Sequence, residues 1–346
     1  MARSVLILAA LGATAFASPM KGRPSIPGEP QRHAAQPFLY AGYYQAAGAT
    51  TKGGGATMKQ GDPGLAPADF HSLGEVAIIS ADLNQIVEIG WTVDPQVNND
   101  VHPRLFVFHW VDGMPTCYNG CGFVQVSTTH RPGDKVTPGA MADYAIELRG
   151  TDWWLRYDND DLGYFPGSLW TTPYTAAGHV QWFGEIASGG AESCTEMGNG
   201  ARGNNPDAAA MSALYLVAGD GSHVPADAAP GEVTNPSYWS VGQLTPTSFA
   251  FGGPGAPSCC TPATCTDSMA MCGAVPDECR TTIKCGDCSA DTVCDQDFQC
   301  GPPPPPGDKP PADDAGCCST GASPMRAVPG LLVLALAVSL RRLRRR

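Results

Sequence analysis

The sequence Ile86-Val87-Glu88-Ile89-Gly90-Trp91-Thr92-Val93 has the pattern of a β-strand with one buried face. Side chains alternate between the two faces of a strand. The alternate positions from Val87 to Val93 are all apolar, which predicts that this face packs on a core. Glu88 lies on the opposite face, and Gly90 leaves room beside its carboxylate.

A second stretch, Val180-Gln181-Trp182-Phe183-Gly184-Glu185-Ile186, repeats this arrangement. Its more apolar face contains Trp182, while Glu185 lies on the other face with Gly184 next to it in the chain. Two such strands in one sheet would bring Glu88 and Glu185 to a shared groove. Paired carboxylates of this kind are suited to general acid–base catalysis.

Short apolar runs alternate with clusters of Gly, Pro, Asn and Asp over residues 39–255, and no run has a long 3.6-residue period. This pattern predicts an all-β domain, an antiparallel β-sandwich with a catalytic groove on one sheet. Residues 150–152, Gly-Thr-Asp, are predicted to form a hairpin turn. The predicted strands include residues 75–79, 86–93, 105–111, 123–127, 144–148, 153–157 and 179–186.

The first 17 residues, MARSVLILAALGATAFA, have the organisation of a secretory signal peptide. A positive start precedes a short apolar run, and residues 15–17 form a small-x-small cleavage site. We predict cleavage before Ser18, followed by a flexible lead over residues 18–38. A membrane anchor is the alternative, but the apolar run is far shorter than the ~20 residues of a spanning helix.

The 14 cysteines indicate an oxidising compartment, and nine of them lie in residues 256–300. We predict that this segment is a small disulfide-rich module, because it has few large apolar residues for a core. A zinc site is the alternative, since Cys285-Gly286-Asp287-Cys288 is a CxxC motif. Spacing alone leaves the connectivity of the module open.

A Pro-rich, semi-rigid linker is predicted over residues 301–316, and the last segment, 317–346, has three parts. A motif with two adjacent cysteines precedes an apolar stretch at residues 330–340 and a terminal arginine cluster. This order resembles the C-terminal sorting tags of myxobacterial surface proteins. The resemblance implies export, contact with sorting machinery at the membrane, cleavage near the cysteines, and display on the outer cell surface or secretion. A short transmembrane tail anchor is the alternative.

The charge of the chain argues against some partners. The formal net charge is −12, and without Arg3 and the six arginines from Arg326 onward 14 Lys and Arg face 33 Asp and Glu. Such an acidic body repels nucleic acid and anionic lipid. We therefore expect no nucleic-acid partner.

Other catalytic and metal-binding motifs have little support in the sequence. The histidines show no HExxH or HxxxH spacing, and no GxSxG is present, so we expect neither a zinc site nor Ser-His-Asp catalysis. Asp158-Asn159-Asp160-Asp161 lacks the full calcium-loop pattern and is typical of a solvated turn.

A series of motifs resembles the neprosin family of glutamic peptidases, in the order of that family and across most of about 215 residues. The segment from Glu88 to Pro95 is similar to the family pattern E-x-G-W-x-V-x-P. The other matches are Arg104-Leu105-Phe106, Trp110, Cys117-Tyr118-Asn119 with Cys121-Gly122-Phe123-Val124-Gln125, Trp153-Trp154-Leu155, Gly163-Tyr164-Phe165-Pro166, Trp182 with Gly184-Glu185, Met197-Gly198-Asn199-Gly200, and Phe251-Gly252-Gly253-Pro254-Gly255.

The resemblance implies a secreted endopeptidase that hydrolyses peptide or protein substrates and cleaves after proline. Two nearby carboxyls hold one proton between them mainly at acid pH, so we expect activity at acid pH. It implies Glu88 and Glu185 as the catalytic pair, with no metal and no cofactor. Tyr118 and Phe183 are candidate substrate contacts. The family pattern also implies a disulfide between Cys117 and Cys121.

Three departures from the family pattern bear on activity. Only about 20 residues precede the domain, so the N-terminal pro-domain of plant neprosins is missing. The family sequence WGGE is replaced by Trp182-Phe183-Gly184-Glu185, which puts a bulky ring two residues from the carboxylate. Ser237 stands where relatives often have a cysteine, and we expect Cys194 to pair with Cys259 instead.

Two further functions use the same residues. One is a non-catalytic surface β-sandwich that binds cell-wall or matrix polymers. The other is a glycoside hydrolase that uses both carboxylates, for which their separation would be diagnostic.

Overall fold

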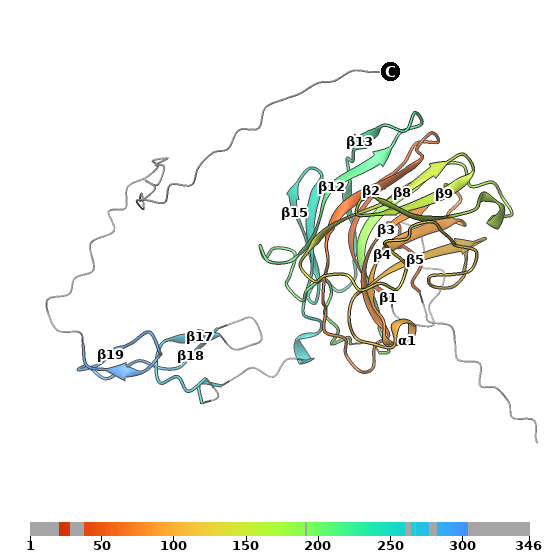
Figure 1. Cartoon of the computed structure of the whole chain (residues 1–346). Coiled ribbons are helices and arrows are strands. Elements are labelled where there is room, and N and C mark those ends of the chain that lie inside the picture. Colours follow the sequence, from red (N-terminus) through yellow and green to blue (C-terminus); the bar gives the residue numbers. More distant parts are fainter. Residues whose placement is uncertain are drawn as a thin grey trace, which may run out of the picture. The chain divides into compact units, whose positions relative to one another are not determined.

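The computed structural model describes residues 21–27, 38–190, 192–259, 264–266, 268–276 and 282–303. These residues fall into two compact units, which divide near residue 263 (Figure 1). The predicted signal peptide, the apolar stretch at 330–340 and the arginine cluster lie outside the described residues. Within the described residues, no helix is long and apolar enough to cross a membrane.

The first sheet of the larger unit has seven antiparallel strands, in the order β14-β1-β11-β3-β4-β5-β6. Strands β11 and β4, which contain the two predicted glutamates, are separated only by β3. The strands are β1 (Phe38–Ala46), β3 (His71–Ile79), β4 (Ile86–Val93), β5 (Arg104–Val111), β6 (Met114–Pro115), β11 (His179–Ala187) and β14 (Ala229–Val233).

The second sheet has nine strands, in the order β15-β16-β12-β2-β8-β9-β10-β7, with β13 paired to β12. Its strands are β2 (Gly53–Lys59), β7 (Val124–Gln125), β8 (Met141–Arg149), β9 (Asp152–Tyr157), β10 (Asp160–Phe165), β12 (Ala209–Val217), β13 (His223–Pro225), β15 (Ser240–Thr245) and β16 (Ser248–Gly252). The helices of the unit are short: α1 (Pro95–Asn98), η1 (Gly167–Leu169) and η2 (Pro257–Cys259). The prediction of an all-β, antiparallel sandwich is confirmed.

The main core lies between the two sheets and contains the apolar faces predicted from the sequence. Trp91 of β4 and Trp182 of β11 are fully buried there, together with Trp153 of β9. A buried indole N–H usually finds an acceptor. Trp182 donates to the carbonyl of Gly55 at 3.1 Å, and Trp153 donates to the carbonyl of Tyr174 at 3.0 Å. The predicted hairpin is also confirmed, with Arg149 of β8 paired to Asp152 of β9.

One predicted strand is shorter than expected. Residues 123–127 were predicted to be extended, but β7 contains only Val124 and Gln125. The amides of Val126 and Ser127 both donate to the carbonyl of Leu162, at 3.0 and 3.1 Å, so the regular ladder ends there. Both residues of β7 are exposed, as is usual for a short edge strand.

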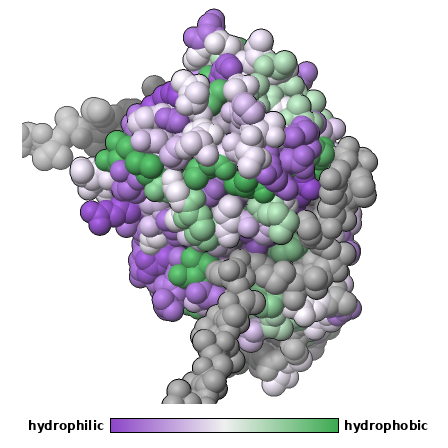
Figure 2. All heavy atoms as spheres, turned by 90° about the vertical axis from the view of Figure 1, so that its right-hand side faces the viewer, coloured by the Kyte–Doolittle hydropathy of each residue, from purple (hydrophilic) through white to green (hydrophobic). Residues whose placement is uncertain are grey.

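The surface viewed in Figure 2 shows hydrophobic side chains only in small groups among polar ones. A broad apolar patch would indicate a protein or membrane contact. The described part of this face has no such patch.

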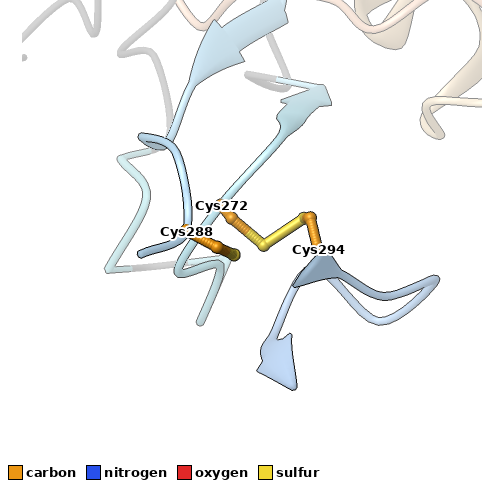
Figure 3. Close-up of side chains that lie close together, drawn as sticks. All are labelled: Cys272, Cys288 and Cys294. Atoms are coloured by element: carbon orange, nitrogen blue, oxygen red, sulfur yellow. A yellow bond between two sulfur atoms is a disulfide. The ribbon is translucent and has the colours of Figure 1, made fainter. Parts of the chain in front are cut away.

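The smaller unit contains two short hairpins, β17 (Ala274–Pro276) with β18 (Thr282–Lys284), and β19 (Val293–Cys294) with β20 (Cys300–Gly301). Three disulfides join its described cysteines: Cys265–Cys285, Cys272–Cys294 and Cys288–Cys300. The sulfurs of Cys272, Cys288 and Cys294 lie within 4.8 Å of one another (Figure 3). Since each is in a disulfide, this cluster offers no thiolate to a metal, and both cysteines of the CxxC motif are likewise oxidised.

Two disulfides lie in the larger unit, Cys117–Cys121 and Cys194–Cys259. The second joins residues 65 positions apart. It attaches the end of the sandwich to the loop that follows β11. Closing a long loop restricts the unfolded chain more than closing a short one.

We predict that the double variant Cys194→Ser/Cys259→Ser is less stable by about 2–4 kcal/mol, because the unfolded chain gains freedom. The midpoint of thermal unfolding should fall, as measured by circular dichroism in non-reducing buffer. Cys117→Ser/Cys121→Ser, which opens a loop of only four positions, is the control and should be affected less. Equal losses in the two variants would contradict the prediction.

Candidate active site

The face of the first sheet that points away from the main core forms a second buried cluster. Its hydrophobic members are Tyr40, Leu73, Ala77, Ile79, Ile86, Phe106, Phe108, Trp110 and Phe183. Three fully buried glutamates lie among them: Glu185 on β11, Glu75 on β3 and Glu88 on β4. Three carboxylates on adjacent strands of an apolar face are costly to bury unless they are paired or protonated.

Strand register explains how the third carboxylate fits. Glu75 lies between Phe183 of β11 and Gly90 of β4. A Cβ atom at Gly90 would lie 2.7 Å from the Cβ of Glu75 and 2.1 Å from the carbonyl oxygen of Gly74. The space that the sequence analysis attributed to Glu88 is therefore occupied by Glu75. Gly184 has a different role, since its missing side chain makes room for Phe251 in the main core.

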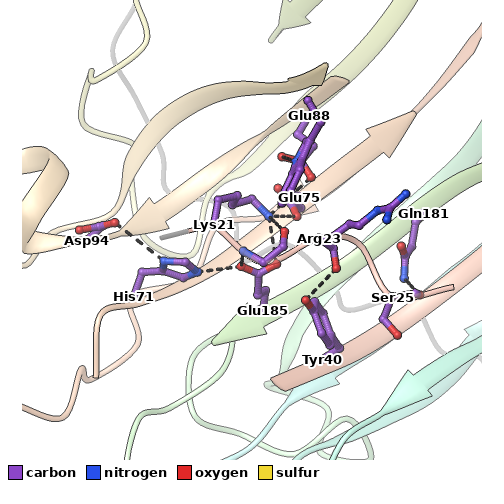
Figure 4. Close-up of polar contacts among 12 residues, drawn as sticks. Lys21, Arg23, Ser25, Tyr40, His71, Glu75, Glu88, Asp94, Gln181 and Glu185 are labelled. Atoms are coloured by element: carbon purple, nitrogen blue, oxygen red, sulfur yellow. Dashed lines mark hydrogen bonds and ion pairs between the residues drawn. The ribbon is translucent and has the colours of Figure 1, made fainter. Parts of the chain in front are cut away.

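Residues 21–27 lie against this face of the sheet, which we call the groove, with the Lys21 ammonium group among the three carboxylates (Figure 4). The Lys21 Nζ is 2.7 Å from Glu75 Oε1, 3.0 Å from Glu185 Oε2 and 3.6 Å from Glu88 Oε1. It also lies 5.7 Å from the centre of the Phe183 ring. This finding differs from the flexible lead predicted for residues 18–38. The physical reason is that a buried cation offsets the charge of the glutamates.

The same segment is held by its backbone. The Gly22 amide donates to Glu185 Oε1 at 2.9 Å. The Tyr40 hydroxyl donates to the Arg23 carbonyl at 2.8 Å, and the Gln181 side-chain amide donates to the Ser25 carbonyl at 2.7 Å. Side chains of the sheet thus bind main-chain groups at three residues of the segment, a mode that does not depend on the side chains of those residues.

Side-chain contacts add to this hold. The Arg23 guanidinium donates to the Leu83 carbonyl, and the Ser25 hydroxyl donates to Glu232. Gly22 fits closely, because a Cβ at this position would lie 2.6 Å from the Tyr40 hydroxyl and 2.7 Å from the Glu185 carboxyl carbon. A larger residue at Gly22 therefore requires the segment or the groove to shift.

Glu185 has a further partner in His71, which lies at the start of β3. His71 Nε2 is 2.9 Å from Glu185 Oε1, and His71 Nδ1 is 3.8 Å from Asp94 Oδ2. Asp94 precedes α1 and accepts hydrogen bonds from the amides of Gln96 and Val97, at 2.9 and 3.1 Å. Figure 4 shows the imidazole between the two carboxylates.

The environments of the glutamates drive their pKa values apart. Burial raises the pKa of Glu88 to about 7, although Lys21 opposes this rise. Burial and the nearby Glu88 raise the pKa of Glu75 well above its usual range. For Glu185, burial acts in the same direction, but Lys21 and His71 outweigh it and lower the pKa. The site therefore favours one ionised carboxylate next to carboxyls that hold protons.

Burial lowers the pKa of Lys21, but the three facing glutamates outweigh this effect and raise it, so Lys21 stays charged. Glu88 is fixed from the other side by the Trp110 indole, which donates to Glu88 Oε2 at 3.3 Å. Glu88 and Glu185 can therefore each accept or donate a proton next to the bound segment.

The structure brings together Glu88, Glu185 and Phe183, three of the residues singled out from the sequence. Phe183 is fully buried in the wall of the groove. Tyr118 packs edge-on against Phe106 and Phe108, with ring centres 5.5 and 5.0 Å apart. It therefore lines the groove on the β5 side, and its hydroxyl has no hydrogen-bond partner among the described residues.

Sequence reasoning missed Lys21, His71 and Glu75. A signal for two of them was present, since residues 71, 73, 75, 77 and 79 alternate on one strand, and Gly90 marked a crowded position. Lys21 had no such signal, because its partners lie 54 to 164 positions away.

Comparison with known families places this geometry in context. The model of the family described as Neprosin matches residues 69–254, more than half of the chain. The chain belongs to the neprosin family. The neprosin match includes all three glutamates, whereas β1, β2 and Lys21 precede it.

Solved structures similar to this neprosin-family chain include two glutamic peptidases. Scytalido-glutamic peptidase with a peptide-based transition-state analogue is 10% identical, with a TM-score of 0.40, over 64% of this chain and 100% of the other. SCP-B, an eqolisin peptidase in complex with the tripeptide Ala-Ile-His, is 9% identical, with a TM-score of 0.38 and the same coverage. The galectin LEC-6 of Caenorhabditis elegans is 9% identical, with a TM-score of 0.25, over 42% and 86%.

The raised pKa of Glu88 makes stability depend on pH. A carboxyl whose pKa is raised on folding contributes stability at low pH that is lost as the pH rises through the folded value, here about 7. We predict that Glu88→Gln raises the unfolding midpoint at pH 8 by several degrees, because the amide stays neutral. The gain should shrink or disappear at pH 4.

Thermal melts of both proteins across this pH range measure the effect. The exposed residue Glu192 supplies a matched control, and Glu192→Gln should leave the pH dependence unchanged. An equal change for Glu88→Gln at both pH values would mean that Glu88 is not buried with a raised pKa.

Proposed function

We propose that this chain is an exported glutamic endopeptidase, and that residues 21–27 occupy its substrate groove in a latent form. One observation carries the proposal: a peptide segment of the chain lies across the groove, bound through its backbone, with two family glutamates at its Lys21 end. A groove that binds a peptide in this way suits a peptide substrate better than a sugar or a cell-wall polymer.

The opposite pKa directions of the two glutamates suggest their roles. Ionised Glu185 takes a proton from a water molecule, whose oxygen attacks the scissile carbonyl carbon. Protonated Glu88 stabilises the developing oxyanion and gives its proton to the leaving nitrogen as the C–N bond breaks. The products are a carboxylic acid and an amine. Proton transfer from Glu185 to Glu88, through solvent, restores the starting state.

These roles require Glu185 to be ionised while Glu88 is protonated. They therefore predict activity at acid pH. The backbone contacts of Tyr40 and Gln181 would hold a substrate as they hold Arg23 and Ser25. Cleavage after proline is proposed from the family resemblance. Phe183 and Tyr118, which line the groove, are the residues that we expect to contact the substrate side chains.

Export and surface display are part of the same proposal. Support comes from the signal-like residues 1–17, from the disulfides in both units, and from the resemblance of residues 317–346 to a sorting tag. An oxidising compartment is where such disulfides persist. The sorting machinery at the membrane would be the partner of the terminal segment.

The first test is hydrolysis of a quenched proline-containing peptide by the full-length chain between pH 2.5 and 7. We predict cleavage at acid pH that falls by about 10²- to 10⁴-fold in both Glu88→Gln and Glu185→Gln. Glu192→Gln is again the control and should keep full activity. If folded protein cleaves neither this peptide nor denatured protein, the peptidase proposal fails and the polymer-binding alternative gains support.

The second test concerns latency. Lys21 lowers the pKa of Glu88 and Glu185 when it is bound, so protonation of these groups at falling pH weakens its hold. We predict that Lys21→Ala raises hydrolysis at pH 5–6 by roughly tenfold or more, since a buried charge pair is lost. The difference in hydrolysis rate between Lys21→Ala and the parent chain should shrink at lower pH, because residues 21–27 of the parent chain are also released there.

Gly22→Ala should act in the same direction, because its added Cβ collides with Tyr40 and Glu185. Lys59→Ala, on the second sheet, is the matched control and should not change the rate. Mass spectrometry of the incubated chain shows whether release is followed by cleavage of the N-terminal segment. Unchanged rates in both Lys21→Ala and Gly22→Ala would contradict latency.

A further inference from the structure

His71 lies at the centre of a line of charged groups that the two-glutamate mechanism does not use. The line runs from Asp94 through His71 to Glu185, and all three side chains are buried. The imidazole ring also stacks on Phe38, with ring centres 6.5 Å apart and planes inclined by 30°. Its orientation is therefore fixed by a ring contact and by two carboxylates.

Glu185 depends on His71 once the N-terminal segment leaves. In the latent form, Glu185 Oε1 is contacted by the Gly22 amide and by His71, while Oε2 is contacted by Lys21. Release of residues 21–27 removes two of these three contacts. Among the residues that the structure describes, His71 then remains as the hydrogen-bonding partner of Glu185.

The other titratable groups around Glu185 offer it no positive charge. Glu75 on β3 and Glu88 on β4 are carboxyls whose pKa values are raised. The Tyr40 and Tyr118 hydroxyls carry no positive charge. Burial in this apolar face raises the pKa of Glu185, and Lys21 and His71 outweigh this effect. Without either cation, the carboxyl would hold its proton over most of the acid range, and it would be a poor base.

The geometry also sets which oxygen is available. His71 holds Oε1 at 2.9 Å, so that Oε2, the atom that faces Lys21 in the latent form, is the one left open toward the groove. Asp94 holds the far side of the ring, and Asp94 is itself positioned by the amides at the start of α1. The imidazole thus lies between two carboxylates, with Glu185 at Nε2 and Asp94 at Nδ1.

We propose that His71 is a positioning residue that keeps Glu185 ionised and aimed into the groove after residues 21–27 are released, with Asp94 orienting the imidazole. This proposal rests on the proposed peptidase function. It assigns Glu185 as the base and Glu88 as the acid. His71 itself does not touch the substrate.

The test is the pH profile of kcat/KM for the full-length chain. In His71→Gln, the side-chain amide can still donate to Glu185, but the positive charge is lost. The pKa of Glu185 then rises, so the acid limb should move to higher pH by about one unit or more. The value of kcat should fall by roughly tenfold or more at low pH, with little change in KM. His71→Leu, which also lacks the donor, should lose more.

Two variants separate this role from a structural one. His109→Gln alters a buried histidine that contacts Thr116 rather than a carboxylate, and its acid limb should not move. Asp94→Asn retains an acceptor for the α1 amides but removes the negative charge behind the ring. It should shift the acid limb in the same direction as His71→Gln, by a smaller amount. If His71→Gln does not fold, Asp94→Asn still tests the proposal.

A second readout does not need activity. In a Lys21→Ala background, the carboxyl carbon of Glu185 is followed by NMR, with Glu185→Gln to assign its signal. The midpoint of the Glu185 titration should lie at higher pH in Lys21→Ala/His71→Gln than in Lys21→Ala. An identical acid limb and an identical titration in His71→Gln would overturn the proposal. A chain that titrates as expected but cleaves nothing would instead count against the peptidase function.

Discussion

The charge balance in the groove is the constraint on which the rest of the site depends. Glu75, Glu88 and Glu185 are buried on one face of a sheet, where an uncompensated carboxylate is strongly unfavourable. The structure solves this with one ammonium group, that of Lys21, and with protons held by Glu75 and Glu88. In the proposed function the same imbalance makes the site reactive, since removing the ammonium leaves carboxyls with separated pKa values facing the groove.

The sandwich makes this balance possible by separating two faces of one sheet. Strands β11, β3 and β4 direct Trp91 and Trp182 into the inter-sheet core, and direct the glutamates to the other side. Because β3 is the central strand of the three, its residues reach both neighbours. Glu75 fits only because position 90 has no side chain, and His71 at the beginning of the strand reaches Glu185.

In the function that we propose, latency and catalysis use the same contacts in different ways. In the proposed latent form, the Lys21 ammonium occupies the space between the glutamates, and the carbonyls of Arg23 and Ser25 accept the hydrogen bonds that we propose for a substrate chain. A short segment is sufficient for this purpose because its hold comes from one buried charge cluster and a few backbone hydrogen bonds.

Local patterns were sufficient for the strands and for the face on which each glutamate lies. The alternation around Glu88 and Glu185 reports directly which side chains face the core, because a strand has a period of two. The hairpin at residues 150–152 follows from turn chemistry in the same way. Residues 123–127 were less predictable, since the end of β7 depends on which carbonyl of a neighbouring strand its amides meet.

The sequence by itself determined the all-β class, the family resemblance and the two glutamates, because each follows from a pattern of residues that are close together in the chain. Only the tertiary structure decided that β3 lies between β4 and β11, that Glu75 and His71 thereby join the site, and that Lys21 is their counter-charge. These contacts join residues up to 164 positions apart. No local pattern encodes them, because they arise from strand order and from the need to neutralise charge that has been buried.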